Sequence, residues 1–399
     1  MRWAEQREFS GLFHDPAVRE DFAMTAKIAR FLEEVRPQTP CVVVDLDVVR
    51  DNYHSLRRWL PLAEVYYAVK ANPAPEIVRM LTEEGSRFDV ASRGEIDLCL
   101  SNGTPAERIS FGNTIKKQSD IAYAYAKGVR LYAFDSEAEL EKLALAAPGS
   151  RVFCRILMTC DGAEWPLSRK FGCEIDMAKD LLVKARDLGL DPYGVSFHVG
   201  SQQTDLKQWD IAVGKAAMLF SALDAAGIDL RMVNLGGGFP ARYRKEVDGI
   251  ERYAEAVMDA MTKHFGNNIP AMIIEPGRSL VGDAGILETE VVLISRKGYE
   301  DDTRWVYLDV GKFGGLAETM DEAIKYRIVT GRDGEDTAPV ILAGPTCDSA
   351  DILYEKAGYE MPVSLKVGDK VRILSTGAYT TSYSAVNFNG FEPLKAYFI

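Results

Sequence analysis

The chain has 399 residues, of which 47% are hydrophobic and 27% are charged, and its formal net charge is -12. This length favours two domains, and the acidic balance argues against nucleic-acid binding, which needs a basic surface. No apolar run approaches the roughly 20 residues that a membrane span requires.

The start of the chain and its cysteines indicate a compartment. Residues Met1–Gln6 lack the apolar core of a signal peptide. The six cysteines show no C-x-x-C spacing, and most lie in apolar patterns, which is typical of buried thiols. We therefore expect a cytoplasmic protein in a reducing environment, without a metal site.

The first 40 residues are predicted to form an N-terminal arm. Ala23–Val35 carries apolar residues at helical spacing, and Pro37 and Pro40 end this pattern. We expect the arm to pack on the C-terminal domain described below.

From Cys41 to about residue 280, short apolar runs alternate with amphipathic helical patterns. After the run Cys41–Asp45, the strand candidates end near Lys70, Ala91, Phe111, Phe134, Ile156, Phe197, Leu235 and Glu275. Eight strand–helix units predict a parallel (β/α)8 TIM barrel over residues 41–280, in the α/β class, with Cys41–Asp45 leading into it.

The pattern changes after about Val281. Ile286–Ser295 alternates between apolar and polar residues, and shorter runs follow at Trp305–Asp309, Val340–Ala343 and Val371–Ser375. Short strands bounded by Gly, Pro and Asp predict an antiparallel β domain, a sandwich or barrel, over residues 281–399.

Lys70 ends the apolar run Val65–Val69 and opens the turn Ala71–Pro73. Polar residues at the carboxyl ends of barrel strands form the active site of such folds. Desolvation lowers the pKa of an amine and leaves it nucleophilic, so Lys70 is placed to form a Schiff base. A lysine at a strand end can also simply reach water, since lysines are rarely buried.

Three further strand ends carry polar residues. Asp89 lies near the end of the second strand, Arg155 lies inside an apolar run, and His198 follows Val195–Phe197. An arginine in such a run needs a partner if it is buried. A histidine on an apolar strand is often structural, but the Gly and Ser after His198 favour contact with a flat ligand group.

The last two strands end in groups suited to a phosphate. The triplet Gly236–Gly238 bares backbone N–H groups and lets an anion approach, although a Gly triplet alone can be only a turn. Glu275 and Arg278 lie three residues apart; an arginine binds phosphate and a carboxylate holds a proton on a ring nitrogen, while a plain ion pair is the simpler alternative. Together with an amine, an acid and a histidine, these groups describe a site for pyridoxal 5'-phosphate.

The C-terminal domain adds four candidates. Cys347 and Asp348 place a thiol beside a carboxylate in a loop, and Tyr379 has a hydroxyl that can reach a phosphate or simply pack. Phe388 begins the segment Phe388–Phe391 and is a candidate for substrate contact.

These motifs together resemble a known family. They are Tyr67–Asn72, Phe88–Ser92, Ser196–Ser201, Gly236–Gly238, Glu275–Arg278, Cys347–Ser349 and Gly377–Tyr379. In this order, over nearly the whole chain, they resemble the fold-type III pyridoxal-phosphate decarboxylases of basic amino acids, the ornithine/lysine decarboxylase family, in its compact bacterial form. The resemblance implies an alanine racemase-like barrel followed by a β domain.

The resemblance implies a role for each residue at the cofactor. Lys70 would hold it covalently, Asp89 would help to set the orientation and protonation of that linkage, and His198 would stack on the pyridine ring. Glu275 would pair with the pyridine nitrogen, with Arg155 beside it. The phosphate would be bound by Ser201, Gly238, Gly277, Arg278 and Tyr379, with Gly237 also against the cofactor.

The resemblance also places a second subunit at the site. Cys347 would return a proton to Cα after carbon dioxide leaves, and Asp348 would contact the distal amine of the substrate. In this family the loop that carries both residues enters the active site of the other subunit, which implies a homodimer with shared sites.

The substrate is expected to be a basic amino acid. Glu318, Asp321 and Glu322 lie where the family has a short helix that senses substrate length, and each is a candidate for the distal-amine contact or for a solvated helix face. One methylene in a pocket is worth only about 1–3 kcal/mol. We therefore expect conversion of L-ornithine to putrescine and CO2, with L-lysine to cadaverine as a second activity, as in polyamine biosynthesis.

Three alternatives stay open. Diaminopimelate decarboxylases typically carry glutamate after the loop cysteine, whereas Asp348 follows Cys347 here. Alanine racemases resemble a pattern with arginine at the pyridine nitrogen, whereas Glu275 would keep that nitrogen protonated as a deeper electron sink. A catalytically inactive homologue that acts as a regulator typically loses the lysine or the phosphate contacts, and this chain keeps Lys70 and Arg278.

Overall fold

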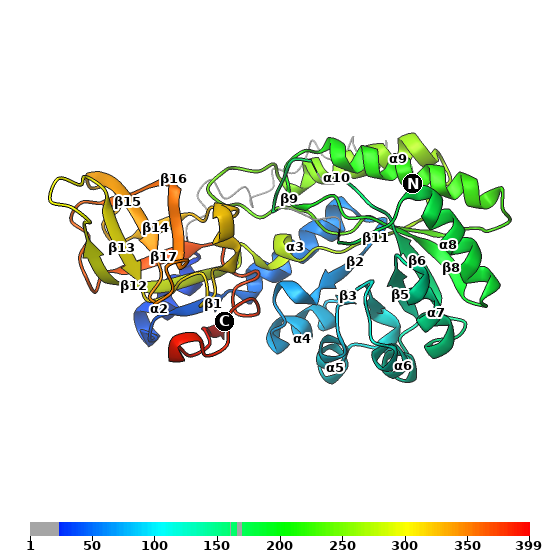
Figure 1. The fold of residues 1–399 in the computed structure, drawn as a ribbon, viewed down its shortest axis with the longest axis horizontal. Helices are drawn as coiled ribbons and strands as arrows, with labels where there is room; N and C mark the ends of the chain where they lie inside the picture. The colour runs from blue at the N-terminus through cyan, green and yellow to red at the C-terminus, as the bar shows by residue number, and fades with distance from the viewer. Residues whose placement is uncertain (1–23, 160, 166–169) are drawn as a thin grey trace.

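The computed structural model describes residues 24–159, 161–165 and 170–399. Two domains lie side by side, a barrel ringed by helices on the right of Figure 1 and a β domain on the left. The first 23 residues of the predicted arm lie outside the described residues.

Eight parallel strands close the barrel, as the sequence predicts. They are β2 (Ala63–Ala68), β3 (Arg87–Val90), β4 (Ile109–Phe111), β5 (Leu131–Phe134), β6 (Arg151–Arg155), β8 (Asp191–Ser196), β10 (Met232–Asn234) and β11 (Ala271–Ile274). Each predicted run ends within two residues of an observed strand, and β11 pairs with β2 to close the ring. Alternate strand residues fill the interior, among them Tyr66, Phe153 and Met232.

Helices follow the strands and surround the barrel (Figure 1). They are α3 (Leu46–Trp59), α4 (Pro75–Glu83), α5 (Arg93–Ser101), α6 (Gln118–Ala126), α7 (Glu137–Ala146), α8 (Ile175–Asp187), α9 (Lys207–Asp224), α10 (Ile250–Phe265) and the short α11 (Arg278–Val281). Side-chain hydrogen bonds cap the start of α5. The Ser92 side chain accepts a hydrogen bond from Glu95 N at 3.3 Å, and the Glu95 carboxylate accepts one from Ala91 N at 2.7 Å.

The second domain is built on one sheet of eight strands. They are β1 (Cys41–Val44), β12 (Gly285–Ser295), β13 (Arg304–Leu308), β14 (Ile328–Thr330), β15 (Thr337–Ala343), β16 (Ile352–Pro362), β17 (Lys370–Leu374) and β18 (Lys395–Phe398). The sheet is mixed rather than wholly antiparallel as predicted, because β13 pairs with β15 and β1 pairs with β18 in parallel. Hydrophobic alternation identifies a half-buried strand but carries no information on the direction of its neighbour.

Strand β1 belongs to this sheet and not to the barrel, which corrects the expectation that Cys41–Asp45 leads into the barrel. It pairs antiparallel with β12, Val42 opposite Leu287. All four β1 residues are buried. The described part of the arm, α2 (Ala26–Val35), packs on the same sheet, with Ile28 and Leu32 in one apolar cluster with Cys41 and Leu374.

Short elements complete the fold. Strands β7 (Ala163–Trp165) and β9 (Ser201–Gln203) form a small antiparallel pair. Short 3₁₀ segments lie at η2 (Val69–Ala71), η3 (Ala106–Arg108), η4 (Ala317–Glu322) and η5 (Phe388–Gly390), and the non-helical residues Met320 and Asp321 interrupt η4. Three of these turns carry predicted site residues.

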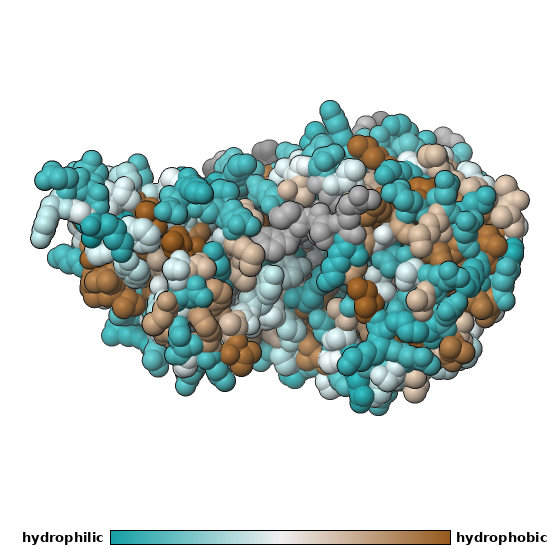
Figure 2. All heavy atoms as spheres, in the orientation of Figure 1, coloured by the Kyte–Doolittle hydropathy of each residue, from teal (hydrophilic) through white to brown (hydrophobic). Residues whose placement is uncertain are grey.

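Polar residues cover most of the face drawn in Figure 2, and apolar residues form small separate groups on it. Among the residues that the structure describes, no helix combines the length and the hydropathy needed to cross a membrane.

Candidate active site

Lys70 lies in a turn whose backbone is held by the second domain. Strand β2 ends at Ala68, and the turn η2 follows. Tyr379 N donates to Ala71 O at 2.8 Å, and the buried Asn72 side chain donates to Gly377 O at 2.8 Å. Val69 and Ala71 are buried while Lys70 is exposed to solvent. The backbone is therefore fixed, and the amine stays accessible to a ligand.

The electrostatic surroundings of Lys70 differ from the expectation. Burial of the groups around the amine acts to lower the pKa of Lys70, but Tyr379, Asp89 and Glu275 outweigh this effect and hold the pKa above its ordinary value. Desolvation therefore acts in the predicted direction, but the predicted lowering of the pKa of Lys70 is wrong, because the net shift is upward. The side chain is solvent-accessible, and three acidic groups face it.

Asp89 is a buried acid that faces Lys70. It is 6% exposed, and its Oδ1 atom has no hydrogen-bond partner within the described part of the chain. Burial raises the pKa of Asp89 well above its ordinary value, the Glu275 carboxylate raises it further, and Lys70 opposes both. Asp89 and Lys70 together therefore hold a proton at this end of the site.

Gly112, which the sequence analysis did not single out, makes room for Asp89. A Cβ atom at position 112 would lie 1.9 Å from Asp89 Oδ1. Gly112 directly follows strand β4, next to the strand that carries Asp89. The sequence feature that could have identified Gly112 is a glycine directly after a predicted barrel strand.

His198 lies at the end of β8 as a neutral ring. Gly200 N donates a hydrogen bond to its Nδ1 atom at 3.0 Å, so that nitrogen is an acceptor. Burial lowers the pKa of His198 well below its ordinary value, and the charges of Arg155 and Lys70 lower it further. Arg155 lies over the ring of Phe171, 5.1 Å from the ring centroid.

Glu275 is oriented by a residue that sequence reasoning missed. Asn234, the last residue of β10, is buried and donates a short hydrogen bond from Nδ2 to Glu275 Oε1. Its Oδ1 atom accepts from Gly236 N at 2.9 Å. Because both amide atoms are used, Asn234 fixes the carboxylate of Glu275 relative to the glycine turn. An amide side chain just before a Gly triplet was the signal that could have found it.

The glycines at the site permit close backbone contacts. A Cβ atom at Gly237 would lie 2.7 Å from Glu275 O, and one at Gly238 would lie 2.5 Å from Gly200 O. Gly277 would place a Cβ atom 2.9 Å from that of Ala71, and it lies near the hydroxyl of Tyr379. Only glycine fits these three positions without displacing backbone or neighbouring side chains.

Arg278 is buried in an ion pair with Glu318. Its two Nη atoms bind the two carboxylate oxygens at 2.5 and 2.7 Å, and both side chains are 3% exposed. Arg278 also donates to the hydroxyl of Tyr243 and, at 3.4 Å, to Ser201 Oγ. Its guanidinium lies over the Tyr379 ring, 4.9 Å from the centroid. The predicted phosphate residues Ser201, Arg278 and Tyr379 are therefore brought together.

The three acids predicted to face a distal amine are placed differently from one another. Both oxygens of Glu318 bind Arg278, so its carboxylate points toward a residue predicted to bind the phosphate. Glu322 accepts hydrogen bonds from Glu355 N and Lys356 N at 2.7 and 2.6 Å. Asp321 is exposed, in a left-handed conformation with φ 52°. Asp321 is thus the most accessible of the three carboxylates.

The loop that carries Cys347 and Asp348 is ordered by Asp351. The buried Asp351 carboxylate accepts from Thr346 N at 3.1 Å and from Lys312 N at 2.7 Å. Cys347 N donates to Asn389 Oδ1 at 2.9 Å. Asp351 therefore fixes the base of the loop, while the Cys347 and Asp348 side chains are exposed.

Phe388 packs edge-on against Phe313, with 5.1 Å between ring centroids. Within the described residues, no hydrogen bond or ion pair joins Cys347, Asp348 or Phe388 to Lys70 of the same chain. The barrel rim thus collects the predicted cofactor residues, and the Cys347 loop remains a separate cluster.

The chain is similar along most of its length to known proteins. Residues 46–282 match the family model described as pyridoxal-dependent decarboxylase, pyridoxal binding domain. A lysine/ornithine decarboxylase of Selenomonas ruminantium is 36% identical over 374 residues, which cover 93% of this chain and 92% of that protein. Antizyme inhibitor 2 of Xenopus laevis is 35% identical over 366 residues, covering 88% of this chain and 78% of that protein.

A solved structure agrees in fold. The crystal structure of a lysine/ornithine decarboxylase from Vibrio vulnificus, complexed with cadaverine, superposes with a TM-score of 0.84 at 29% identity, covering 94% of this chain and 100% of that one.

Proposed function

Because the chain belongs to the family of pyridoxal-dependent decarboxylases, we propose that it converts L-ornithine to putrescine and CO2, and L-lysine to cadaverine and CO2. The observation that carries this proposal is the gathering of Lys70, Glu275 and Arg278 on one barrel rim. The chain around them is similar over its length to a lysine/ornithine decarboxylase. The activity is that of a carbon–carbon lyase acting on a basic amino acid.

The cofactor is pyridoxal 5'-phosphate, and the residues at the rim fit it. The Nε atom of Arg278 is buried and has no hydrogen-bond partner among the described residues, as is also true of Asp89 Oδ1. Glycines at 237, 238 and 277 leave space that a Cβ atom would fill. The site thus offers the Lys70 amine for an aldehyde, the Arg278 guanidinium for a phosphate and the Glu275 carboxylate for a ring nitrogen.

We assign Lys70 to the aldehyde, Glu275 to the ring nitrogen and Arg278 with Ser201 and Tyr379 to the phosphate. The bound cofactor supplies an electron sink for the pair left on Cα when CO2 departs. Glu275, oriented by Asn234, holds a proton on the ring nitrogen and so deepens that sink. Tyr379 stays protonated, because burial raises its pKa, and its hydroxyl is a hydrogen-bond donor.

The neutral ring of His198 suits a stacking role. A charged imidazolium beside a protonated pyridine would repel it, and the lowered pKa of His198 avoids this. Asp89, opposite Lys70, retains a proton near the amine, because its own pKa is raised and Glu275 adds negative charge. Arg155 contributes positive charge that limits the protonation of both His198 and Lys70.

We assign proton return at Cα to the Cys347 thiol and the distal-amine contact to Asp348, both from a second copy of the chain. Both side chains are exposed, and they do not contact Lys70 of their own chain. Asp321 is the acid of the 318–322 segment that we place near the distal amine, since Glu318 and Glu322 are already hydrogen-bonded. A carboxylate there matches an amine better than a second carboxylate, which disfavours diaminopimelate.

A homodimer is supported by the surface beside the Cys347 loop. Large hydrophobic side chains are exposed in one short segment, with Val386 at 78%, Phe391 at 44% and Phe388 at 38%. Exposed apolar patches of this kind mark interaction surfaces. We propose that a second copy of the chain covers this segment and receives the exposed Cys347 at its barrel rim.

The test is product formation by mass spectrometry, with cofactor-loaded protein and equimolar ornithine, lysine, arginine and meso-diaminopimelate. We expect putrescine and cadaverine, and their ratio sets the preference between the two substrates. Lysine formed from diaminopimelate would contradict this proposal and show diaminopimelate decarboxylase activity instead. Absence of any amine product from fully loaded protein would contradict catalysis and favour a regulatory homologue.

A further inference from the structure

A cleft lies at the opposite end of the barrel from Lys70. It has a volume of about 670 Å³ and is lined where strands β2, β3 and β4 begin and where α3 ends. Ala63 is the first residue of β2, Arg87 is the first of β3, and Arg108 precedes β4. Lys70 and Asp89 lie near the carboxyl ends of these strands, so the cleft and the candidate active site are separate.

The cleft is basic in a chain that is acidic overall. Four arginines line it, Arg57, Arg58, Arg87 and Arg108, whereas Glu64 is the one acid among the described lining residues. The chain as a whole has a formal net charge of -12. Gathering guanidinium groups on one concave surface of an acidic protein costs repulsion unless an anion offsets it.

Glu64, the acid among the described residues that line the cleft, is already paired. Arg87 Nη2 lies 3.0 Å from Glu64 Oε1. Arg87 also donates from Nη1 to Glu107 O at 3.2 Å, and its guanidinium lies 5.8 Å from the ring centroid of Tyr66. Arg87 is therefore held in place, and Glu64 offsets its charge and not the charges of Arg57 and Arg108.

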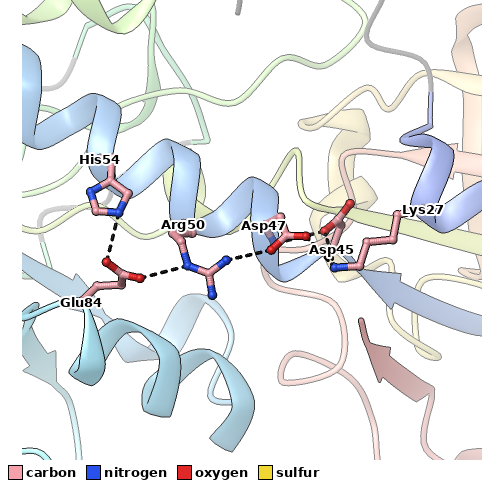
Figure 3. A network of polar contacts seen from close by, with 6 residues as sticks. All are labelled: Lys27, Asp45, Asp47, Arg50, His54 and Glu84. Carbon is pink, nitrogen blue, oxygen red and sulfur yellow. Dashed lines mark hydrogen bonds and ion pairs between the residues drawn. The ribbon is translucent and has the colours of Figure 1, made fainter.

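The carboxylate of a neighbouring acid, Glu84, is also bonded to other side chains. Figure 3 shows it between α3 and α4, with one carboxylate oxygen on Arg50 and the other on His54. The distances are 2.9 Å to Arg50 Nε and 3.0 Å to His54 Nε2. Arg50 continues the network to Asp47 at 2.7 Å. Both oxygens of the Glu84 carboxylate are therefore bonded to Arg50 and His54.

The dipole of helix α3 does not account for all four arginines of the cleft. Arg57 and Arg58 lie in the last turn of α3, where basic residues interact favourably with the helix dipole. Arg87 is the first residue of β3, and Arg108 is the last residue of the three-residue 3₁₀ turn η3, so the α3 dipole reaches neither of them through its own helix. Arg57 lies over the ring of Tyr53, 5.7 Å from its centroid, and Tyr53 also lines the cleft.

We propose that this cleft binds a small oxyanion with two or more phosphate groups. Guanidinium groups match phosphate oxygens in pairs of parallel hydrogen bonds. Arginines on three separate elements favour a ligand that presents several phosphates over a monovalent anion, which would satisfy one arginine. The volume lies in the range of small-molecule sites.

The test uses protein fully loaded with pyridoxal 5'-phosphate, so that phosphate sites on the opposite rim are occupied. Isothermal titration calorimetry with inorganic triphosphate, at about 0.15 M salt to screen surface charge, is expected to show saturable binding. The double variant Arg57→Gln/Arg108→Gln should bind triphosphate at least about tenfold more weakly than the unmodified protein. Circular dichroism and decarboxylase activity check that this variant is folded.

A control variant with the same change of net charge is Arg186→Gln/Arg252→Gln, on exposed surfaces of α8 and α10. It should bind triphosphate as the unmodified protein does. An equal loss in both variants, or no saturable binding to the unmodified protein, would overturn the proposal. A parallel titration with ATP separates the ligand sources: similar affinity supports a site that recognises phosphates alone, and binding of ATP without triphosphate would overturn it.

Discussion

Glu318 neutralises Arg278 with both of its carboxylate oxygens, in a pair that is 3% exposed on each side. Arg278 is the residue that we assign to the phosphate of the cofactor. A buried guanidinium needs a compensating anion. Glu318 supplies that charge in the protein alone, and the phosphate adds a second negative group when it binds.

We expect Glu318→Gln to destabilise the cofactor-free protein more than the loaded protein. Removing one partner of a buried ion pair costs about 3–5 kcal/mol, but the phosphate offsets part of this loss when it lies beside Arg278. Thermal unfolding of both forms measures the difference. Glu255→Gln, which breaks an exposed pair with Arg252, is the matched control and should change little. An equal shift in both forms would show that Arg278 does not bind the phosphate.

We expect Asn234→Ala to lower kcat by about tenfold or more, because a hydrogen bond to a charged group is worth about 1.5–3 kcal/mol. Asn234 donates to Glu275 Oε1 and holds it against the glycine turn. Steady-state kinetics should show the loss in kcat and not in KM, since Asn234 acts through Glu275. The exposed Asn268→Ala serves as the control. A folded Asn234→Ala protein with normal kcat would exclude this positioning role.

Mixing inactive subunits tests whether the sites are shared. Lys70→Ala should lose the absorption band of the lysine-bound cofactor, and Cys347→Ala should keep it but slow product formation. If Cys347 acts on the partner's site, each mixed dimer holds one intact site, and random exchange restores about a quarter of the normal activity. Equal mixtures incubated to exchange subunits are assayed against each variant alone. No recovery after verified exchange would show that Lys70 and Cys347 do not act together across the two subunits.

We expect His198 to stay neutral in the folded protein at pH values where an ordinary histidine is already protonated. Burial and the charges of Arg155 and Lys70 lower its pKa, whereas an ordinary histidine is half protonated near about pH 6.5. The unfolded chain therefore takes up a proton that the folded chain does not, so His198 reduces stability as the pH falls below about 6.5. Histidine-labelled NMR spectra from pH 8 to 5.5, with His198→Asn to assign the signal, measure this directly. A His198 signal that titrates near pH 6.5 would contradict the expectation.

Strand periodicity was enough to place the eight barrel strands, each within two residues, and the polar residues at their carboxyl ends. This works because the strands of a parallel barrel are buried on both faces and read as short apolar runs. It did not assign β1, which has the same apolar character but pairs with β12 in the other domain. A four-residue buried strand does not encode its partner, and the pairing depends on sequence more than 240 residues away.

The roles of acidic residues were harder to predict than their presence. Glu318 and Asp321 lie three residues apart in one turn, yet one is buried against Arg278 and the other is exposed. Asn234 and Gly112 were not predicted at all, because their importance lies in contacts to Glu275 and Asp89 on neighbouring strands.

The amino-acid sequence by itself therefore determined the barrel, the family and the chemical types at its rim, since these depend on local periodicity and on motifs a few residues long. Only the tertiary structure decided which charges face one another: the raised pKa of Lys70, the pairing of Arg278 with Glu318 and the basic cleft at the far end of the barrel. Electrostatic interactions depend on distance and burial in three dimensions, and neither is written in the order of the residues.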